Sequence, residues 1–151
     1  MSTLADPKVR AACRERIQRL DPNASAKWGR MTVHQMVCHL TDSYVYALGE
    51  KPASSNTGLF QRTLMKWVAL RVPLPWPKGI ATRPEMEQGK GGSAPIEFSQ
   101  DRATLIATLN HFCDQLPQPV LAHPTFGPME PADWWRWGYL HADHHLRQFG
   151  R

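Results

Sequence analysis

The 151-residue sequence predicts an all-α protein, an up-and-down bundle of helices in a single domain that spans residues 1–151. Three observations lead to this fold class. Five segments carry helical periodicity or clear capping signals, namely 7–20, 33–48, 58–72, 100–116 and 133–150. Two stretches rich in proline and glycine, 73–95 and 120–131, have no periodicity and are expected to be long loops. No segment shows the alternation typical of a strand.

The first two helices are marked by their N-terminal caps. Asp6 followed by Pro7 predicts a helix start, because the aspartate can accept a first-turn amide and proline fits the first helical position. Thr32 and Gln35 have the spacing of a capping box at the start of the second helix. Gly49 is expected to end that helix.

The next two helices have weaker signals. Thr57 is the expected cap of the third helix, which ends before Pro73 and carries six large apolar side chains: Leu59, Phe60, Leu64, Trp67, Val68 and Leu70. Ser99 is the expected cap of the fourth helix, and Pro117 ends it.

The composition argues against several classes of protein. The net charge of +5 permits nucleic-acid binding, but the basic residues form no dense run, so we expect no nucleic-acid partner. No apolar run approaches the ~20 residues of a membrane span, and the N-terminus lacks the apolar core of a signal peptide, so we expect a cytoplasmic protein without a membrane partner. Because the three cysteines are isolated, no disulfide framework or thiolate zinc site is indicated, and we expect small buried side chains at Cys13, Cys38 and Cys113.

The closing segment 133–150 places histidines on the buried face of a helix. Residues four apart lie about 40° apart around a helix axis, so one face carries Trp134, Trp137, Gly138, His141, His145 and Gln148. The tryptophans indicate that this face is buried, whereas Asp143, Arg136 and Arg147 point the other way. His141 and His145 therefore occupy positions where an imidazole needs a partner.

Two imidazoles at i and i+4 can both reach one metal ion, such as zinc or a similar divalent cation. A third ligand must come from elsewhere, and His39 in the body of the second helix is the best placed. Three other histidines are less well placed: His34, His111 and His123. The competing interpretation is that His141 and His145 are hydrogen-bonded core residues and that His39 lies at the surface.

Two further residues of the closing helix have candidate roles. His144 lies about 60° from His141 around the axis, where it either lines a pocket as an acid/base group or alternative ligand, or packs as a partly exposed side chain. Gln148 faces inward one turn beyond His145, so it can orient an imidazole. Asp143 and Arg147 have the spacing of a solvated ion pair.

Other reaction chemistries lack their signatures. No G-x-S-x-G elbow, phosphate-binding loop or dinucleotide fingerprint is present. Cys38 and His39 are neighbours in sequence, so their side chains diverge by about 100° on a helix, which argues against a cysteine-protease dyad.

Three stretches together resemble a known superfamily. They are the W-G-x-M-x-x-x-x-M-x-x-H pattern of 28–39, the H-P-T-F-G sequence of 123–127, and the H-x-x-H-H-x-x-Q run of 141–148. Over residues 28–150 the chain is similar to an uncharacterised domain family of the DinB-like (DinB/YfiT-like) metal-binding superfamily. The closing run is the most specific part of the resemblance.

The resemblance implies an up-down-down-up four-helix bundle with an additional short helix and long loops, often as a homodimer. It implies a divalent metal, zinc or nickel, held by one histidine of the second helix and two of the last, which are His39, His141 and His145 here. Better-known relatives are thiol-dependent transferases and isomerases that use bacillithiol, mycothiol or glutathione.

The sequence therefore leads to one main functional expectation. We expect a metal-dependent enzyme for a small-molecule substrate, in which the three-histidine site activates a low-molecular-weight thiol cosubstrate or water, as in a transferase or hydrolase. His144 is the expected catalytic acid/base, and the 73–95 loop is expected to cover the pocket. The alternative is a non-catalytic helical bundle that binds a metal or a small molecule.

Overall fold

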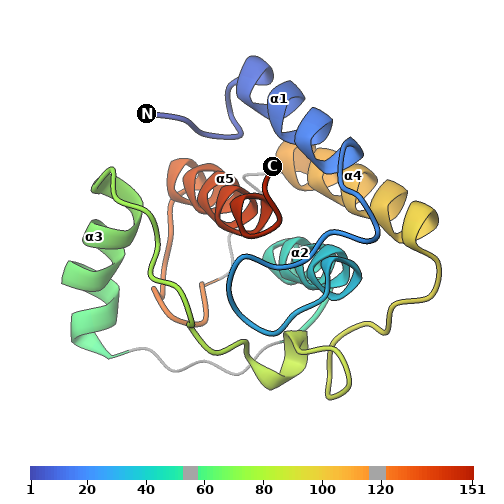
Figure 1. Ribbon diagram of the computed structural model, residues 1–151. Helices are drawn as coiled ribbons and strands as arrows, with labels where there is room; N and C mark the ends of the chain where they lie inside the picture. The colour runs from blue at the N-terminus through green and yellow to red at the C-terminus, as the bar shows by residue number, and fades with distance from the viewer. Residues whose placement is uncertain (53–57, 116–121) are drawn as a thin grey trace.

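The computed structural model describes residues 1–52, 58–115 and 122–151, and within these ranges it contains five α-helices and no strand (Figure 1). The helices are α1 (Pro7–Gln18), α2 (Val33–Ala47), α3 (Lys66–Arg71), α4 (Phe98–Gln115) and α5 (Pro131–Gln148). The prediction of an all-α protein is confirmed. None of these helices is both long and apolar enough to cross a membrane.

The predicted caps of α1 and α2 are present. The Asp6 side chain accepts a hydrogen bond from the Lys8 amide at 2.8 Å. Thr32 and Gln35 form both hydrogen bonds of the capping box. Gly49 follows α2 with φ +82°, a left-handed conformation that glycine adopts without strain, and so ends the helix as expected.

The predicted cap of α4 is wrong. Helix α4 already includes Ser99, and the Glu97 carboxylate accepts hydrogen bonds from the Ser99 amide at 3.0 Å and the Gln100 amide at 2.8 Å. A carboxylate before the first turn satisfies two of the free amides and also favours the positive end of the helix dipole. Thr57, the predicted cap of the third helix, lies outside the described residues.

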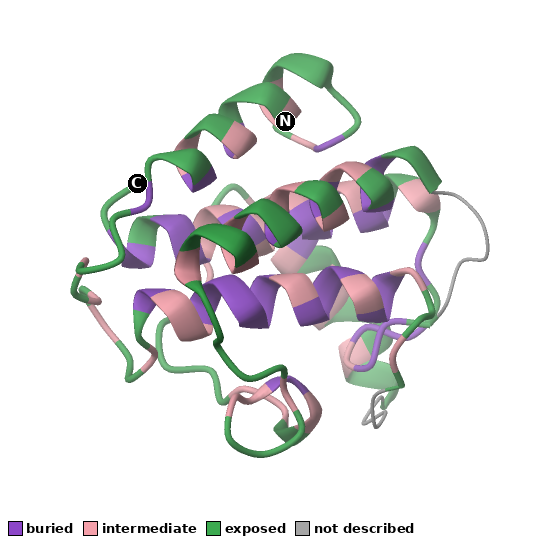
Figure 2. Cartoon of the chain, turned by 90° about the vertical axis from the view of Figure 1, so that its right-hand side faces the viewer, coloured by how far each residue is buried: buried purple, intermediate pink, exposed green. Residues whose placement is uncertain are grey.

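Helix α5 runs through the middle of the molecule in Figure 1, beside α1, α2 and α3, while α2 packs along α4. Trp134 of α5 is fully buried, and Tyr44 of α2 is also fully buried and donates a hydrogen bond to the Gly138 carbonyl at 2.9 Å. Figure 2 shows buried residues along most of α2 and exposed residues on the outward sides of α1 and α4. The contact between α2 and α5 is therefore a buried one, and it is here that the candidate site lies.

The third predicted helix is not a single α-helix. A π-helical turn, η1 (Gln61–Met65), leads into the short α3, which lies at the side of α5. Of the six apolar side chains of the predicted third helix only Leu70 is buried, and the other five are 44–81% exposed. Lys66 and Arg71 both form ion pairs with Asp133, which tie this segment to the start of α5.

The long stretch between α3 and α4 packs against α2. It contains one turn of 3₁₀ helix, η2 (Pro84–Met86), which contacts α2. Further along, the amide and the hydroxyl of Ser93 both donate to the buried Asp42 carboxylate, at 2.8 and 2.7 Å. Lys51 forms an ion pair with the same carboxylate at 3.0 Å. The contacts of η2 and Ser93 with α2 hold the stretch over the side of α2 that carries His39.

Candidate metal centre

The three histidines that the sequence predicts as ligands lie together between α2 and α5. His39 of α2 faces His141 and His145, which are one turn apart on α5. The ring centroids are 4.9–5.1 Å apart in all three pairs. One ligand nitrogen from each ring lies within 4.8 Å of the other two. The three imidazoles can therefore hold one metal ion.

The outer nitrogens of two of these imidazoles are occupied by hydrogen bonds. His39 Nδ1 lies 3.2 Å from the Met86 carbonyl oxygen, which can only accept, so this nitrogen carries the proton. His145 Nδ1 lies 2.9 Å from Oε1 of Gln148. The amide nitrogen of Gln148 donates to the Trp28 carbonyl at 2.7 Å, which fixes its orientation and makes Oε1 the acceptor. Nε2 of both histidines is therefore unprotonated and has a free lone pair, which is the form that binds a metal.

The separation of the inner nitrogens fits a shared ion. Nε2 of His39 and Nε2 of His141 are 3.1 Å apart. Two nitrogens that are each about 2.1 Å from one ion lie about 3.0–3.4 Å apart for angles of about 90–110° at the metal. Nδ1 of His141 is buried and has no hydrogen-bond partner among the described residues, so the protein does not prevent this ring from presenting Nε2.

Burial keeps the cluster neutral. Desolvation, with the neighbouring His39 acting in the same direction, lowers the pKa of His145 to about 3. Desolvation also lowers the pKa of His39 and, together with His145, that of His141. All three imidazoles are therefore uncharged at neutral pH, which is the state that binds a divalent cation.

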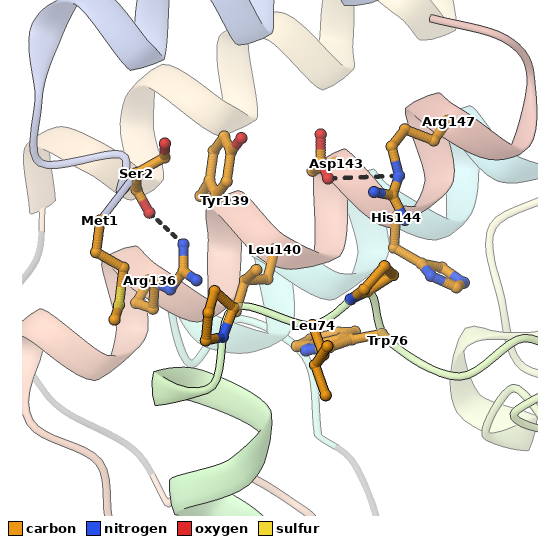
Figure 3. Close-up of a pocket in the computed structure, with 12 residues that line it drawn as sticks. Met1, Ser2, Leu74, Trp76, Arg136, Tyr139, Leu140, Asp143, His144 and Arg147 are labelled. Carbon is orange, nitrogen blue, oxygen red and sulfur yellow. Dashed lines mark hydrogen bonds and ion pairs between the residues drawn. The ribbon is translucent and has the colours of Figure 1, made fainter.

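A cavity of about 360 Å³, whose lining residues are drawn in Figure 3, lies along α5 next to the cluster. Its wall includes Trp76, from the stretch that was expected to cover the pocket, and His144 of α5. The Trp76 ring is 6.0 Å from the His141 ring, and the His144 ring is 5.2 Å from the His145 ring. Trp76 and His144 therefore contact both the cavity and the three-histidine cluster, whose members are not part of the cavity wall.

His144 contacts the cavity, Trp28 and the cluster. The ring packs edge-on against Trp28 at 5.7 Å, and burial lowers its pKa, with the neighbouring Arg147 adding to the effect. Its Nδ1 atom is buried without a hydrogen-bond partner among the described residues. His144 is thus a neutral imidazole that touches both the cavity and the cluster, and it matches both of the interpretations made from the sequence.

The other candidate histidines lie away from the cluster. His34 makes a 2.6 Å hydrogen bond to Asp101, and His111 lies 3.6 Å from Glu50 near the surface. The His123 ring stacks on Phe126 and is part of a turn before α5. The preference for His39 as the third member agrees with this geometry.

One assignment on the closing helix is wrong. Arg136, expected on a solvated face, is buried, and its guanidinium donates to the Leu70 carbonyl at 3.1 Å and the Ser2 carbonyl at 2.6 Å. The N-terminus and α3 cover this side of α5, which the periodicity of one helix cannot reveal. The Asp143–Arg147 pair is present at 3.6 Å, but Arg16 of α1 lies closer to the carboxylate, at 2.8 Å.

Comparison with known proteins identifies the family of the chain but no activity. A family model described as "Protein of unknown function (DUF1569)" matches residues 3–151. No curated protein and no solved structure matches the chain.

Proposed function

The chain belongs to the family described as "Protein of unknown function (DUF1569)", and we propose that it is a divalent-metal-dependent enzyme. In this proposal His39, His141 and His145 hold zinc or nickel, and the protein acts as a thiol-dependent transferase or a hydrolase. One observation carries the proposal: three neutral imidazoles converge, with two Nε2 atoms at the 3.1 Å separation of ligands on one ion. The resemblance to the DinB-like superfamily, including its up-down-down-up helix order, supports the same assignment.

A divalent ion at this site would supply Lewis acidity and lower the pKa of a bound thiol or water. The protein's own residues have distinct parts. Gln148 and the Met86 carbonyl keep the Nδ1 protons on His145 and His39, so that both Nε2 atoms stay available. Trp76 limits the access of water to the cluster. His144, neutral and on the cavity wall, is placed to accept a proton from a small molecule in the cavity.

The cavity wall also suggests the charge of the substrate. Two guanidinium groups, those of Arg136 and Arg147, and one carboxylate, that of Asp143, line it. This excess of positive charge next to neutral imidazoles favours an anionic substrate, such as a thiol that carries carboxylate groups.

A non-catalytic metal-binding bundle is the second candidate, and burial is the observation that favours it. His39 is 6% exposed and His145 is 9% exposed, and Trp76 of the cavity wall packs against His141. A structural metal site is usually closed by four protein ligands. Among the described residues, the group around these two rings contains one further member, His141. Three ligands leave a position for an outside molecule, and this favours the enzyme.

Both candidate functions assume that the three-histidine cluster binds a metal, and metal analysis of protein purified without a histidine tag tests this. We expect His145→Ala to contain about one equivalent less zinc or nickel than the wild type. The matched variant His111→Ala, whose ring is half-exposed and outside the cluster, should contain as much metal as the wild type. Protein without stoichiometric metal, together with no effect of His145→Ala on metal content or thermal stability, contradicts the proposal.

Binding of a thiol separates the enzyme from the non-catalytic bundle. Glutathione and S-methylglutathione are titrated into the metal-loaded and the metal-free protein in a calorimeter. Tighter binding of the free thiol, seen only with metal present, supports a thiol-dependent enzyme. Equal binding of both compounds removes the thiol role and leaves hydrolysis to be tested with ester and amide substrates.

We further propose that the protein works in the cytoplasm as a homodimer. All three cysteines are free and buried, which suits a reducing compartment. The dimer rests on the resemblance alone, and light scattering of the purified protein during gel filtration tests it.

A further inference from the structure

A second group of side chains that could hold a metal ion lies where the first two turns of α2 meet the first turn of α4. His34 and Cys38 are one turn apart on α2, and Asp101 faces them from the first turn of α4. His34 Nε2 is 2.6 Å and Cys38 Sγ is 3.9 Å from the same carboxylate oxygen of Asp101. One donor atom from each residue lies within 4.8 Å of the other two.

We propose that His34, Cys38 and Asp101 form a second divalent-cation site, separate from the three-histidine cluster and independent of the proposed enzyme function. Nitrogen, sulfur and oxygen donors together suit a borderline ion such as Zn²⁺ or Co²⁺ rather than Mg²⁺ or Ca²⁺. The sequence alone did not indicate a thiolate site, because a lone cysteine has no C-x-x-C partner and the carboxylate comes from a distant helix.

Access and charge both support a cation at this place. The side chains of His34 and Asp101 are 23% and 21% exposed, so an ion can enter from solvent, while Cys38 forms the buried inner side at 5% exposure. The carboxylate of Asp101 and the thiolate of Cys38 together balance the charge of a dication, which offsets part of the cost of burying it.

The proton balance of binding is simple. The Cys38 thiol loses its proton to solvent as the sulfur becomes a ligand. In the metal-free protein His34 Nε2 carries a proton and donates a hydrogen bond to the Asp101 carboxylate. When the metal binds, this proton is transferred through water to Nδ1 of the same ring, and Nε2 becomes a ligand of the metal. Asp101 Oδ2 keeps its hydrogen bond from the Ile96 amide at 2.9 Å, which orients the carboxylate in both states.

The two sites lie on different sides of α2. Cys38 and His39 are adjacent, so their side chains diverge by about 100° around the helix. His39 points to α5 and Cys38 to the start of α4. Because the three-histidine cluster contains no sulfur donor, thiolate ligation distinguishes one site from the other spectroscopically.

Titration of metal-free full-length protein with CoCl₂ tests the proposal, with a phosphine reductant in place of a thiol. We expect a near-ultraviolet sulfur-to-cobalt charge-transfer band in the wild type, and we expect it to remain in His141→Ala, which disables the three-histidine cluster. The band should disappear in Cys38→Ser, together with about one equivalent of bound cobalt. The matched variant Cys113→Ser, which changes another buried cysteine, should keep it.

Each alternative result has a clear meaning. The absence of the band in the wild type overturns the proposal, as does a band that survives in Cys38→Ser or is lost in Cys113→Ser. If far-ultraviolet circular dichroism shows that Cys38→Ser is unfolded, His34→Gln replaces it, because that side chain is partly exposed. A band of unchanged intensity and cobalt affinity in His34→Gln then refutes the site. If the three-histidine cluster binds no metal, this band is still expected. Failure of the proposed function and failure of the second site are therefore distinguishable.

Discussion

We expect His123→Asn to make the free energy of unfolding less sensitive to acid. His123 is 8% exposed, and its ring stacks on Phe126 at 4.6 Å with Trp134 and Trp137 close by. Its Nδ1 atom accepts hydrogen bonds from the Thr125 and Phe126 amides, both at 3.1 Å. A protonated ring would lose both hydrogen bonds and carry a buried charge. Folding therefore requires this imidazole to stay neutral.

The effect of pH follows from the two states of this group. Burial lowers the pKa of His123 from 6.5 in the unfolded chain to about 3 in the folded protein, and the nearby Arg83 and Lys66 act in the same direction. Between these values the unfolded chain binds a proton that the folded protein does not. The stability that the neutral His123 contributes is therefore fully present above pH 6.5 and is lost as the pH falls toward 3. At pH 5 this one group lowers the free energy of unfolding by about 2 kcal/mol.

Urea unfolding, followed by tryptophan fluorescence, measures the effect on metal-free protein at pH 7.5 and pH 5. Asparagine at position 123 can accept the same two amides through Oδ1, as in an Asx turn, but does not titrate. The loss of the ring contacts lowers the stability of the variant at both pH values. The titration of His145 and the other histidines affects the variant and the wild type equally, so it cancels in the comparison. We expect the difference in free energy of unfolding between variant and wild type to move by about 2 kcal/mol in favour of the variant at pH 5. A difference that is the same at both pH values would refute the buried neutral state of His123.

Three further predictions concern the three-histidine cluster and the cysteines. Gln148→Met removes the hydrogen bond that orients His145 and should weaken metal binding by about 10–100-fold in competition with a chelator; unchanged affinity would show that the orientation does not matter. Trp76→Ala opens the cover over His141 and should speed the transfer of metal to a chelator in stopped flow, whereas the matched Trp67→Ala, at a side chain that is 59% exposed, should not. Because burial raises the pKa of the three cysteine thiols to about 11–12, metal-free protein should react with Ellman's reagent at pH 8 only after urea unfolds it, and rapid labelling of the folded protein would contradict this.

The closing helix shows how much of the site follows from sequence. A single helical wheel places His141, His145 and Gln148 on one face, because that face is set by the backbone geometry of the helix and by its tryptophans. The structure brings these three residues together with His39 as expected. The same wheel fails for Arg136, because what covers the far side of a helix depends on other segments of the chain.

The irregular stretches limit the prediction in another way. Trp76 and the Met86 carbonyl complete the surroundings of the cluster, but both come from a stretch without periodicity, so no local pattern fixes their positions. The partnership of His34 with Asp101 joins the starts of two helices that are far apart in sequence. Spacing along the chain identifies residues on one helix face, whereas contacts between helices depend on packing that the sequence pattern does not encode.

The two candidate sites should respond differently to anions, because their donors differ in charge. His39, His141 and His145 are neutral and leave the charge of a bound dication uncompensated, so this site should attract an outside anion. A carboxylate and a thiolate, from Asp101 and Cys38, neutralise the other site. With cobalt bound, we expect azide to change the visible absorption of Cys38→Ser, which retains only the three-histidine site, and to leave that of His141→Ala unchanged. The reverse pattern, or no response of either variant, would contradict the assignment of an open, reactive position to the three-histidine cluster.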